Sequence, residues 1–115
     1  MHKVARMKSE ARIVILHCVF CDFLPEVSGA ARDALFEELS NLSLSLEGVE
    51  TFEFGPNRDF EQKSQNFSAG FVIRFRDQAA LEAYAVHPGH QALGAQLCDM
   101  CTGGADGIVV FDLEI

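Results

Sequence analysis

Residues 12–20 (RIVILHCVF) are apolar at almost every position. Successive side chains of a strand point to opposite faces of a sheet, so a strand of this composition is covered on both faces. Residues 108–115 (IVVFDLEI) begin with a similar apolar run at the other end of the chain. Two such strands predict a sheet with helices on one face and a second apolar layer on the other. In the first strand we expect the two faces to carry Val14, Leu16, Cys18 and Phe20 and, opposite them, Ile13, Ile15 and Val19.

The spacing of apolar residues between these strands predicts the remaining elements. From Pro25 to about Leu46, alanine and leucine recur every three or four residues, as in an amphipathic helix that Gly48 would end. After this helix, two segments of alternating apolar residues predict two strands. Two segments with helical spacing come next, and Asp77 is placed to cap the first of these helices. The expected segments are residues 12–20, 25–46, 49–54, 68–76, 77–85, 88–100 and 108–115. This order is typical of a ferredoxin-like α+β domain, a four-stranded antiparallel sheet with helices on one face.

Such a sheet would leave its second face apolar. In the last strand, Val109, Phe111 and Leu113 would add to that face. A soluble monomer rarely exposes so large an apolar patch. A second copy packed sheet to sheet would cover it, which predicts a homodimeric α/β barrel. The alternative is that part of this face lies under the long loop that follows the second strand.

Length and charge narrow the class of protein. The length of 115 residues is that of a single domain, which we expect at residues 12–115. We expect residues 1–11 to form a flexible tail, and the native start is either Met1 or Met7. The formal net charge of −8 argues against a nucleic-acid partner. No stretch approaches the roughly 20 apolar residues of a membrane span, and no cleavage site of a secretory signal follows the first strand. We therefore expect a cytoplasmic protein with no membrane partner.

Two C-x-x-C pairs raise the alternative of a structural zinc site. Cys18 and Cys21 form the first pair, and Cys98 and Cys101 form the second. In a strand, however, positions 18 and 21 differ in parity and point to opposite faces. The pairs also lack the glycine-rich turns of zinc ribbons. We expect no metal, with the cysteines reduced and behaving as small buried hydrophobic residues.

A divalent cation in the long loop is a further alternative. Asn57, Asp59 and Glu61 would supply oxygen ligands. Their spacing lacks the central glycine and the terminal glutamate of a calcium loop. A solvated loop is the better interpretation, and no cofactor is expected.

Five segments of the chain are similar to the stress-responsive dimeric α/β-barrel (Dabb) domain family. They are RIVILHCVFCDF, LEGVETFEFGPN, GFVIRFRD, LEAYAVHPGHQALGAQL and GIVVFDLE, and together they extend from Arg12 to Ile115. The most specific feature is a Tyr-x-x-His-Pro-x-His block before an apolar helix. The resemblance implies a ferredoxin-like protomer whose sheet faces that of a second copy. Function varies within the family: many bacterial members have no established activity, plant members are linked to stress and defence, and a polyketide cyclase of this fold uses a Tyr and His pair.

The resemblance places an active pair at Tyr84 and His90, with His17 on the first strand lining the same cavity. The residues themselves give partial support. His90 shares a helix face with Leu93 and Leu97, and its place in the first turn disfavours the imidazolium. A neutral imidazole can accept a proton, and the Tyr84 hydroxyl can hold a carbonyl oxygen. A histidine in an apolar strand needs a hydrogen-bond partner. We expect apolar ligand contacts from Leu35, Phe71, Leu93 and Leu97.

Structural roles are equally open for these histidines. Pro88 suits the first helical position, so His87 is expected to cap the helix, whereas His90 and His17 could each be satisfied inside a packed core. Ala69 stands where the cyclase has a histidine, which puts the cyclase's substrate in doubt.

We predict binding of a small, largely apolar ligand between sheet and helices, with cofactor-free acid–base chemistry as its possible consequence. The alternative is a non-catalytic dimer that serves as a structural or interaction module.

Overall fold

The computed structural model describes residues 13–115, and the predicted tail at residues 1–11 lies outside this range. Its elements follow the predicted order, with a short 3-10 helix added before the last strand. They are β1 (Ile15–Cys21), α2 (Gly29–Leu44), β2 (Val49–Pro56), β3 (Ala69–Phe75), α3 (Gln78–Val86), α4 (Pro88–Asp99), η1 (Gly104–Gly107) and β4 (Ile108–Glu114). No helix within residues 13–115 has the length and apolar composition needed to cross a bilayer.

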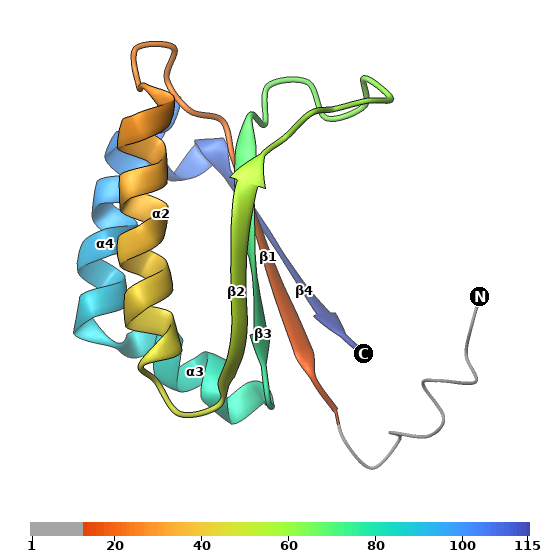
Figure 1. The fold of residues 1–115 in the computed structure, drawn as a ribbon, viewed down its shortest axis with the longest axis vertical. Coiled ribbons are helices and arrows are strands. Elements are labelled where there is room, and N and C mark those ends of the chain that lie inside the picture. Colours follow the sequence, from red (N-terminus) through yellow and green to blue (C-terminus); the bar gives the residue numbers. More distant parts are fainter. Residues whose placement is uncertain (1–12) are drawn as a thin grey trace.

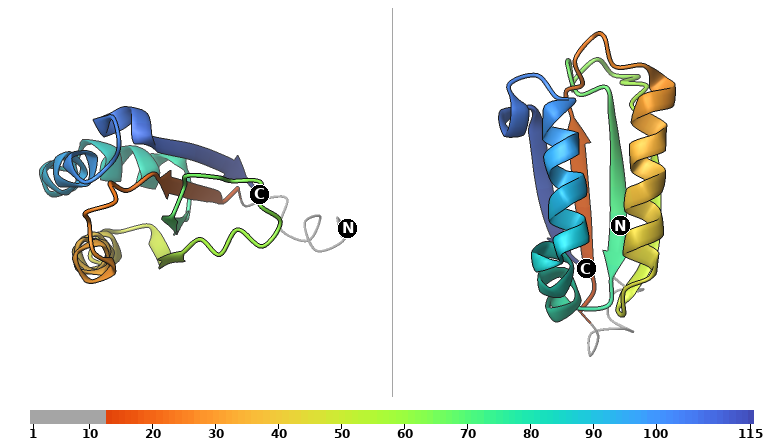
Figure 2. Two further views of the ribbon diagram at one scale, coloured as in Figure 1. Left: turned by 90° about the horizontal axis from the view of Figure 1, so that it is seen from above. Right: turned by 90° about the vertical axis from the view of Figure 1, so that its left-hand side faces the viewer.

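The four strands form one antiparallel sheet in the order β2-β3-β1-β4. This arrangement confirms the predicted ferredoxin-like α+β class. All three α-helices lie on one side of the sheet, with α2 beside α4 (Figures 1 and 2). Within the described residues, nothing lies on the other side except the loop between β2 and β3, which extends away from the helices (Figure 1).

The core lies between the helices and one face of the sheet. Strand β3 contributes the alternating residues Phe71, Ile73 and Phe75, and none of them is more than 4% exposed. From β1, Ile15 and Val19 face the same way, as expected from their parity. The face toward the helices is therefore a packed apolar layer.

The other face of the sheet, which we call the open face, is apolar over β1 and β4, whereas Arg74 of β3 and Thr51 and Glu53 of β2 make it polar toward the β2 edge. By strand parity and register, it carries Leu16, Cys18, Phe20, Val72, Val109, Phe111 and Leu113. Phe111 and Leu113 are half-exposed, at 53% and 50%. The alternation predicted for β1 and β4 is thus confirmed within the strands. Ile13 and Val14 precede β1, and their exposed fractions of 51% and 4% are the reverse of what their predicted faces imply.

Local capping explains the helix boundaries. Helix α2 begins after Ser28, whose hydroxyl accepts from the Ala31 N–H at 3.1 Å, rather than at Pro25. Helix α3 begins after Asp77 as predicted, with the carboxylate accepting from the Ala80 N–H at 2.9 Å. Gly48 does not end α2, which ends at Leu44 with Ser45 as its C-cap. With a φ of 89°, Gly48 forms the turn into β2.

Candidate functional site

His17 lies in the middle of the sheet, on the face toward the helices. The register of β1 places it between Ile73 and Asp112. Its Nδ1 is 2.6 Å from Oδ1 of Asp112. A carboxylate only accepts hydrogen bonds, so the imidazole donates through Nδ1 and the lone pair of a neutral ring lies on Nε2. The His17 side chain is 13% exposed.

Tyr84 packs against this histidine from α3. It is 1% exposed, and its ring centroid is 5.9 Å from that of His17 and 5.3 Å from that of Phe75. Burial raises the pKa of Tyr84 to about 12, which the nearby Ser43 hydroxyl opposes in part. Neither hydroxyl completes a hydrogen bond within the described residues, although both oxygens are buried. The phenol is therefore protonated, and the Ser43 hydroxyl is its polar neighbour.

His90 also packs against Tyr84. The two ring centroids are 4.1 Å apart with an interplanar angle of 39°. The His90 Nδ1–H donates to the carbonyl oxygen of Ala85 at 3.1 Å, so its lone pair lies on Nε2. Burial lowers the pKa of His90, and the positive charges that His17 and His87 can carry lower it further, against the opposing effect of the Ala85 carbonyl. The ring is held neutral near pH 7.

The structure thus brings the three predicted residues together, with the Tyr84 ring in contact with both imidazoles. In their neutral forms, two imidazoles and one phenol offer two proton acceptors and one hydrogen-bond donor. Sequence reasoning missed Asp112, the carboxylate that orients His17. Its signal was an acidic residue next to the apolar run of the last strand, which also contains Glu114, but identifying its partner requires the register between β1 and β4.

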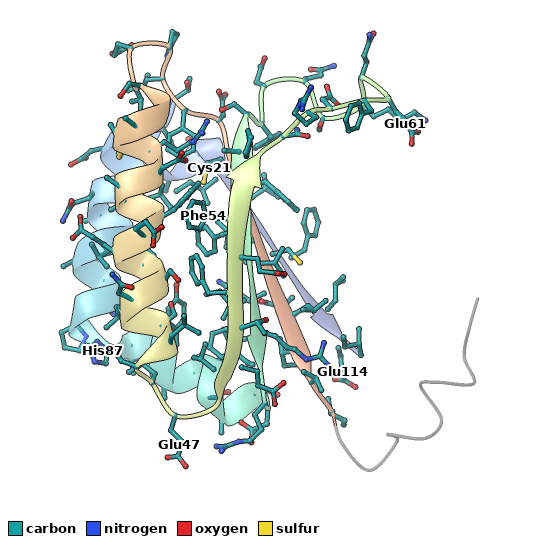
Figure 3. The ribbon with its side chains drawn as sticks, viewed as in Figure 1. Cys21, Glu47, Phe54, Glu61, His87 and Glu114 are labelled. Carbon is teal, nitrogen blue, oxygen red and sulfur yellow. The ribbon has the colours of Figure 1, made fainter. Side chains whose placement is uncertain are left out.

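His87 has a structural role, as predicted. It is the N-cap of α4, where its Nδ1 accepts from the Gly89 N–H at 2.9 Å and Pro88 occupies the first turn. Figure 3 shows it at one end of the helix layer. The histidines on either side of Pro88-Gly89 therefore differ: His87 starts the helix, and His90 contacts Tyr84.

The four residues predicted to contact a ligand lie in or against the packed core. Leu35, Phe71 and Leu97 are each 4% exposed, and Leu93 is half-buried against them. A cleft of about 900 Å³ lies elsewhere, between the open face and the loop that follows β2. Of these four residues only Phe71 also lines that cleft. As ligand contacts, the four residues stay predictions.

The cysteines occupy both faces of the sheet. By strand parity, Cys18 lies on the open face, whereas Cys21 lies between sheet and helices, as Figure 3 shows. Cys21 is close enough to Cys101 for their thiols to interact, and burial raises the pKa of both, that of Cys101 to about 11. Within residues 13–115, no group of three or more His, Cys, Asp or Glu side chains is arranged to hold a metal ion.

The carboxylate proposed as a cation ligand is used inside its own loop. Asp59 accepts from the Lys63 N–H, the Ser64 N–H and the Ser64 hydroxyl, at 2.9, 3.0 and 2.7 Å. The Ser64 hydroxyl is the largest cause of the lowered pKa of Asp59, and the two N–H donors add to it. Asn57 also binds within the loop, to Ser64 and to the carbonyl of Phe67. These hydrogen bonds give Asp59 and Asn57 structural roles.

Comparison with known proteins bears on this fold and site. The sequence model of the stress-responsive A/B barrel domain matches residues 15–115. The chain belongs to this family. Comparison with curated proteins gave no match. A dimeric ferredoxin-like protein of unknown function from Jannaschia sp. CCS1 is 44% identical, with a TM-score of 0.83 over 89% of this chain and 99% of the other.

More distant structures share the family's fold. A protein from Arabidopsis thaliana is 22% identical, with a TM-score of 0.75 over 86% of this chain and 92% of its own. A hydroxynitrile lyase from Passiflora edulis is 16% identical, also with a TM-score of 0.75, over 89% of this chain and 93% of its own. At these identities the comparisons show the stress-responsive barrel fold alone.

Proposed function

We propose that this protein binds a small, largely apolar ligand that carries a carbonyl group, and that it transfers protons on that ligand without a cofactor. The observation that carries the proposal is the buried Tyr84 hydroxyl, which completes no hydrogen bond within the described residues although the Ser43 hydroxyl lies near it, on a ring that contacts two imidazoles. Buried polar groups are nearly always paired, so an unpaired donor in such a place marks a site for a ligand oxygen. In Passiflora edulis, a protein of this fold is named as an enzyme, a hydroxynitrile lyase.

Each residue has a distinct part in the proposed reaction. The Tyr84 hydroxyl donates to the carbonyl oxygen and stabilises the negative charge that develops there. Nε2 of neutral His90 removes a proton from the carbon beside the carbonyl, and the bonding electron pair moves to form the enolate. His17, held by Asp112, is a second base and accepts or returns a proton. Return of the proton from the imidazolium restores both enzyme and ligand.

We also propose that the protein is a homodimer joined through the open face. Seven apolar residues gather there and the helices cover only the opposite face. The relative from Jannaschia, which is 44% identical, is described as dimeric. Packing two such faces together would bury the patch in a two-sheet barrel.

Four unpaired cysteines fit a reducing compartment, which supports a cytoplasmic location.

A non-catalytic dimeric module is the second candidate. The observation that favours it is the packing of Leu35 and Leu97, each 4% exposed, where a ligand was predicted. The cleft of about 900 Å³ lies on the other face of the sheet. In this alternative the His and Tyr side chains are parts of the core.

Deuterium exchange distinguishes the two candidates. With acetophenone as the probe in D2O, we expect the protein to accelerate loss of the methyl proton signal in NMR, because the methyl carbon lies beside a carbonyl. His90→Gln and Tyr84→Phe should each reduce the acceleration by roughly 100-fold or more, typical of a lost acid or base. The matched control is His87→Asn, which keeps a capping side chain and should exchange at the wild-type rate. Equal rates with and without protein would favour the non-catalytic module.

A further inference from the structure

Phe60 is the most exposed of the large apolar side chains in the part of the chain that the structure describes. It is 83% exposed, in the loop between β2 and β3. Its neighbour Glu61 marks the outermost part of this loop in Figure 3, on the side away from the helices. The guanidinium of Arg58 lies over the Phe60 ring, 5.4 Å from its centroid. An exposed aromatic ring thus belongs to the loop that extends away from the helices.

The loop at residues 57–68 is built to hold this shape, and we call it the arm. Asp59 accepts three hydrogen bonds from Lys63 and Ser64. Asp59, Gln62 and Gln65 adopt positive φ angles of 45°, 57° and 41°. Residues other than glycine adopt this region only at an energetic cost, and such strain concentrates where a conformation has a use. A preorganised arm loses less entropy when it binds a partner.

The arm is also a wall of the cleft on the open face. The floor of the cleft includes Phe20, Val72 and Phe111, and Lys63 and Phe67 of the arm form part of its side. Whatever covers the open face therefore lies against the arm. Figure 2, seen from above, shows the arm reaching beyond the sheet on the side opposite the helices.

We propose that the arm clasps the second copy of this chain and that Phe60 is buried against it. The inference rests on the dimer proposed above, because the occupant of the open face is then the partner sheet. Two-fold symmetry makes the contact reciprocal, so each arm extends past the sheet it belongs to and holds the other protomer. An exposed aromatic anchor that becomes buried is the kind of residue that contributes most to an interface.

The chain has no tryptophan, so a single introduced indole reports on this contact. In the Phe60→Trp dimer, we expect indole fluorescence that is blue-shifted and protected from quenching by acrylamide. Phe111→Asp should make the protein monomeric, so both effects should be lost when the two substitutions are combined. The matched reporter is Val86→Trp, at a position on the helix side that is 70% exposed and should stay open to quencher in both backgrounds. Phe60→Ser should raise the dimer Kd roughly tenfold or more, whereas Val86→Ser should change it by less than about threefold.

The two proposals fail in different ways. A dimer by light scattering in which the Phe60→Trp indole is quenched as readily as the Val86→Trp indole would overturn the clasp and leave the dimer standing. A monomer at all accessible concentrations would overturn both. Protection of the Phe60→Trp indole that persists in the monomeric background would assign the burial to the arm itself and also overturn the clasp.

Discussion

At the scale of single residues, the Tyr84 hydroxyl has the least compensated environment in the site. It is buried and lacks a hydrogen-bond partner in the described residues, while its ring packs against His17, Phe75 and His90. A polar group in this state opposes folding, and the molecule keeps it at the position where a ligand oxygen is proposed to bind. Stability and function are therefore expected to conflict at this residue.

Tyr84→Phe should stabilise the free protein while it reduces the acceleration of proton exchange on acetophenone by roughly 100-fold or more. Removal of an unpaired buried hydroxyl that leaves the ring in place is expected to raise the free energy of unfolding by about 1 kcal/mol. Urea denaturation measures the change, and Ser43→Ala, which removes the other unpaired hydroxyl, is the companion variant. A loss of about 1 kcal/mol in either variant would instead indicate that the two hydroxyls bond to each other.

His90 should make stability depend on pH in a defined direction. Its pKa in the folded protein is lowered, chiefly by burial, from an ordinary value of about 6.5. Below that value the unfolded chain binds the proton more readily, so the contribution of neutral His90 is present above about pH 6.5 and is lost as the pH falls through the folded pKa. Urea denaturation over this range should show a weaker pH dependence in His90→Gln than in wild type. A steeper dependence would contradict the lowered pKa.

Sequence reasoning predicted three polar residues of the candidate site but missed Ser43 and Asp112. Tyr84, His90 and His17 were recognised from a family motif and from a histidine in an apolar strand. Asp112 was not, because the contact joins residues 95 positions apart and depends on the register between two strands. The missing hydrogen bond of Tyr84 could not be predicted either, since it reflects the geometry of the surrounding core.

At the scale of elements, the turn between α2 and β2 depends on one glycine. Gly48 has a φ of 89°, and a Cβ added there would lie 2.5 Å from the Cβ of Ala80 in α3. The turn therefore needs both the left-handed conformation and the missing side chain. It sets the position of β2 against the helix layer.

Gly48→Ala should lower the free energy of unfolding by roughly 2 kcal/mol, because it adds backbone strain and a steric clash. The matched control is Gly94→Ala in α4, where an added Cβ meets nothing within 4 Å. That variant should gain about 0.5 to 1 kcal/mol, since alanine favours the helix over glycine. Chemical denaturation of both variants tests the pair, and similar effects at the two positions would contradict the account of the turn.

The elements themselves were largely predictable, and their ends less so. Apolar periodicity gave the type and order of the strands and α-helices, and Asp77 and His87 marked helix starts. The start of α2 was misplaced because Pro25 suggested a helix start, whereas the hydrogen bond from Ala31 N–H to Ser28 decides it. The 3-10 helix η1 has no apolar period by which the sequence could predict it.

At the scale of the whole molecule, the main feature is the open face, whose apolar residues no other element of the described chain covers completely. Its apolar residues follow from the alternation in β1 and β4, which is why the sequence alone pointed to a second layer. The arm could not be foreseen, because its direction relative to the sheet depends on three positive φ angles in a polar loop.

Phe111→Asp should convert the dimer to a monomer. A carboxylate in the middle of two packed sheets would lose its water without gaining a partner. Light scattering should give twice the chain mass of 12.7 kDa for wild type and a single chain mass for the variant. Val86→Asp on the helix side is the control and should stay dimeric. Wild-type protein that scatters as a monomer would contradict the assembly.

The central claim is that Tyr84 and the two imidazoles form one enclosed acid–base site. Its most direct test is NMR titration of His17, His87 and His90 in the native protein and in Tyr84→Phe. We predict that His90 titrates below about 6.5, the ordinary value for histidine, and that its titration shifts when the Tyr84 hydroxyl is removed. A His90 that titrates like a free surface histidine and ignores the substitution would contradict the claim.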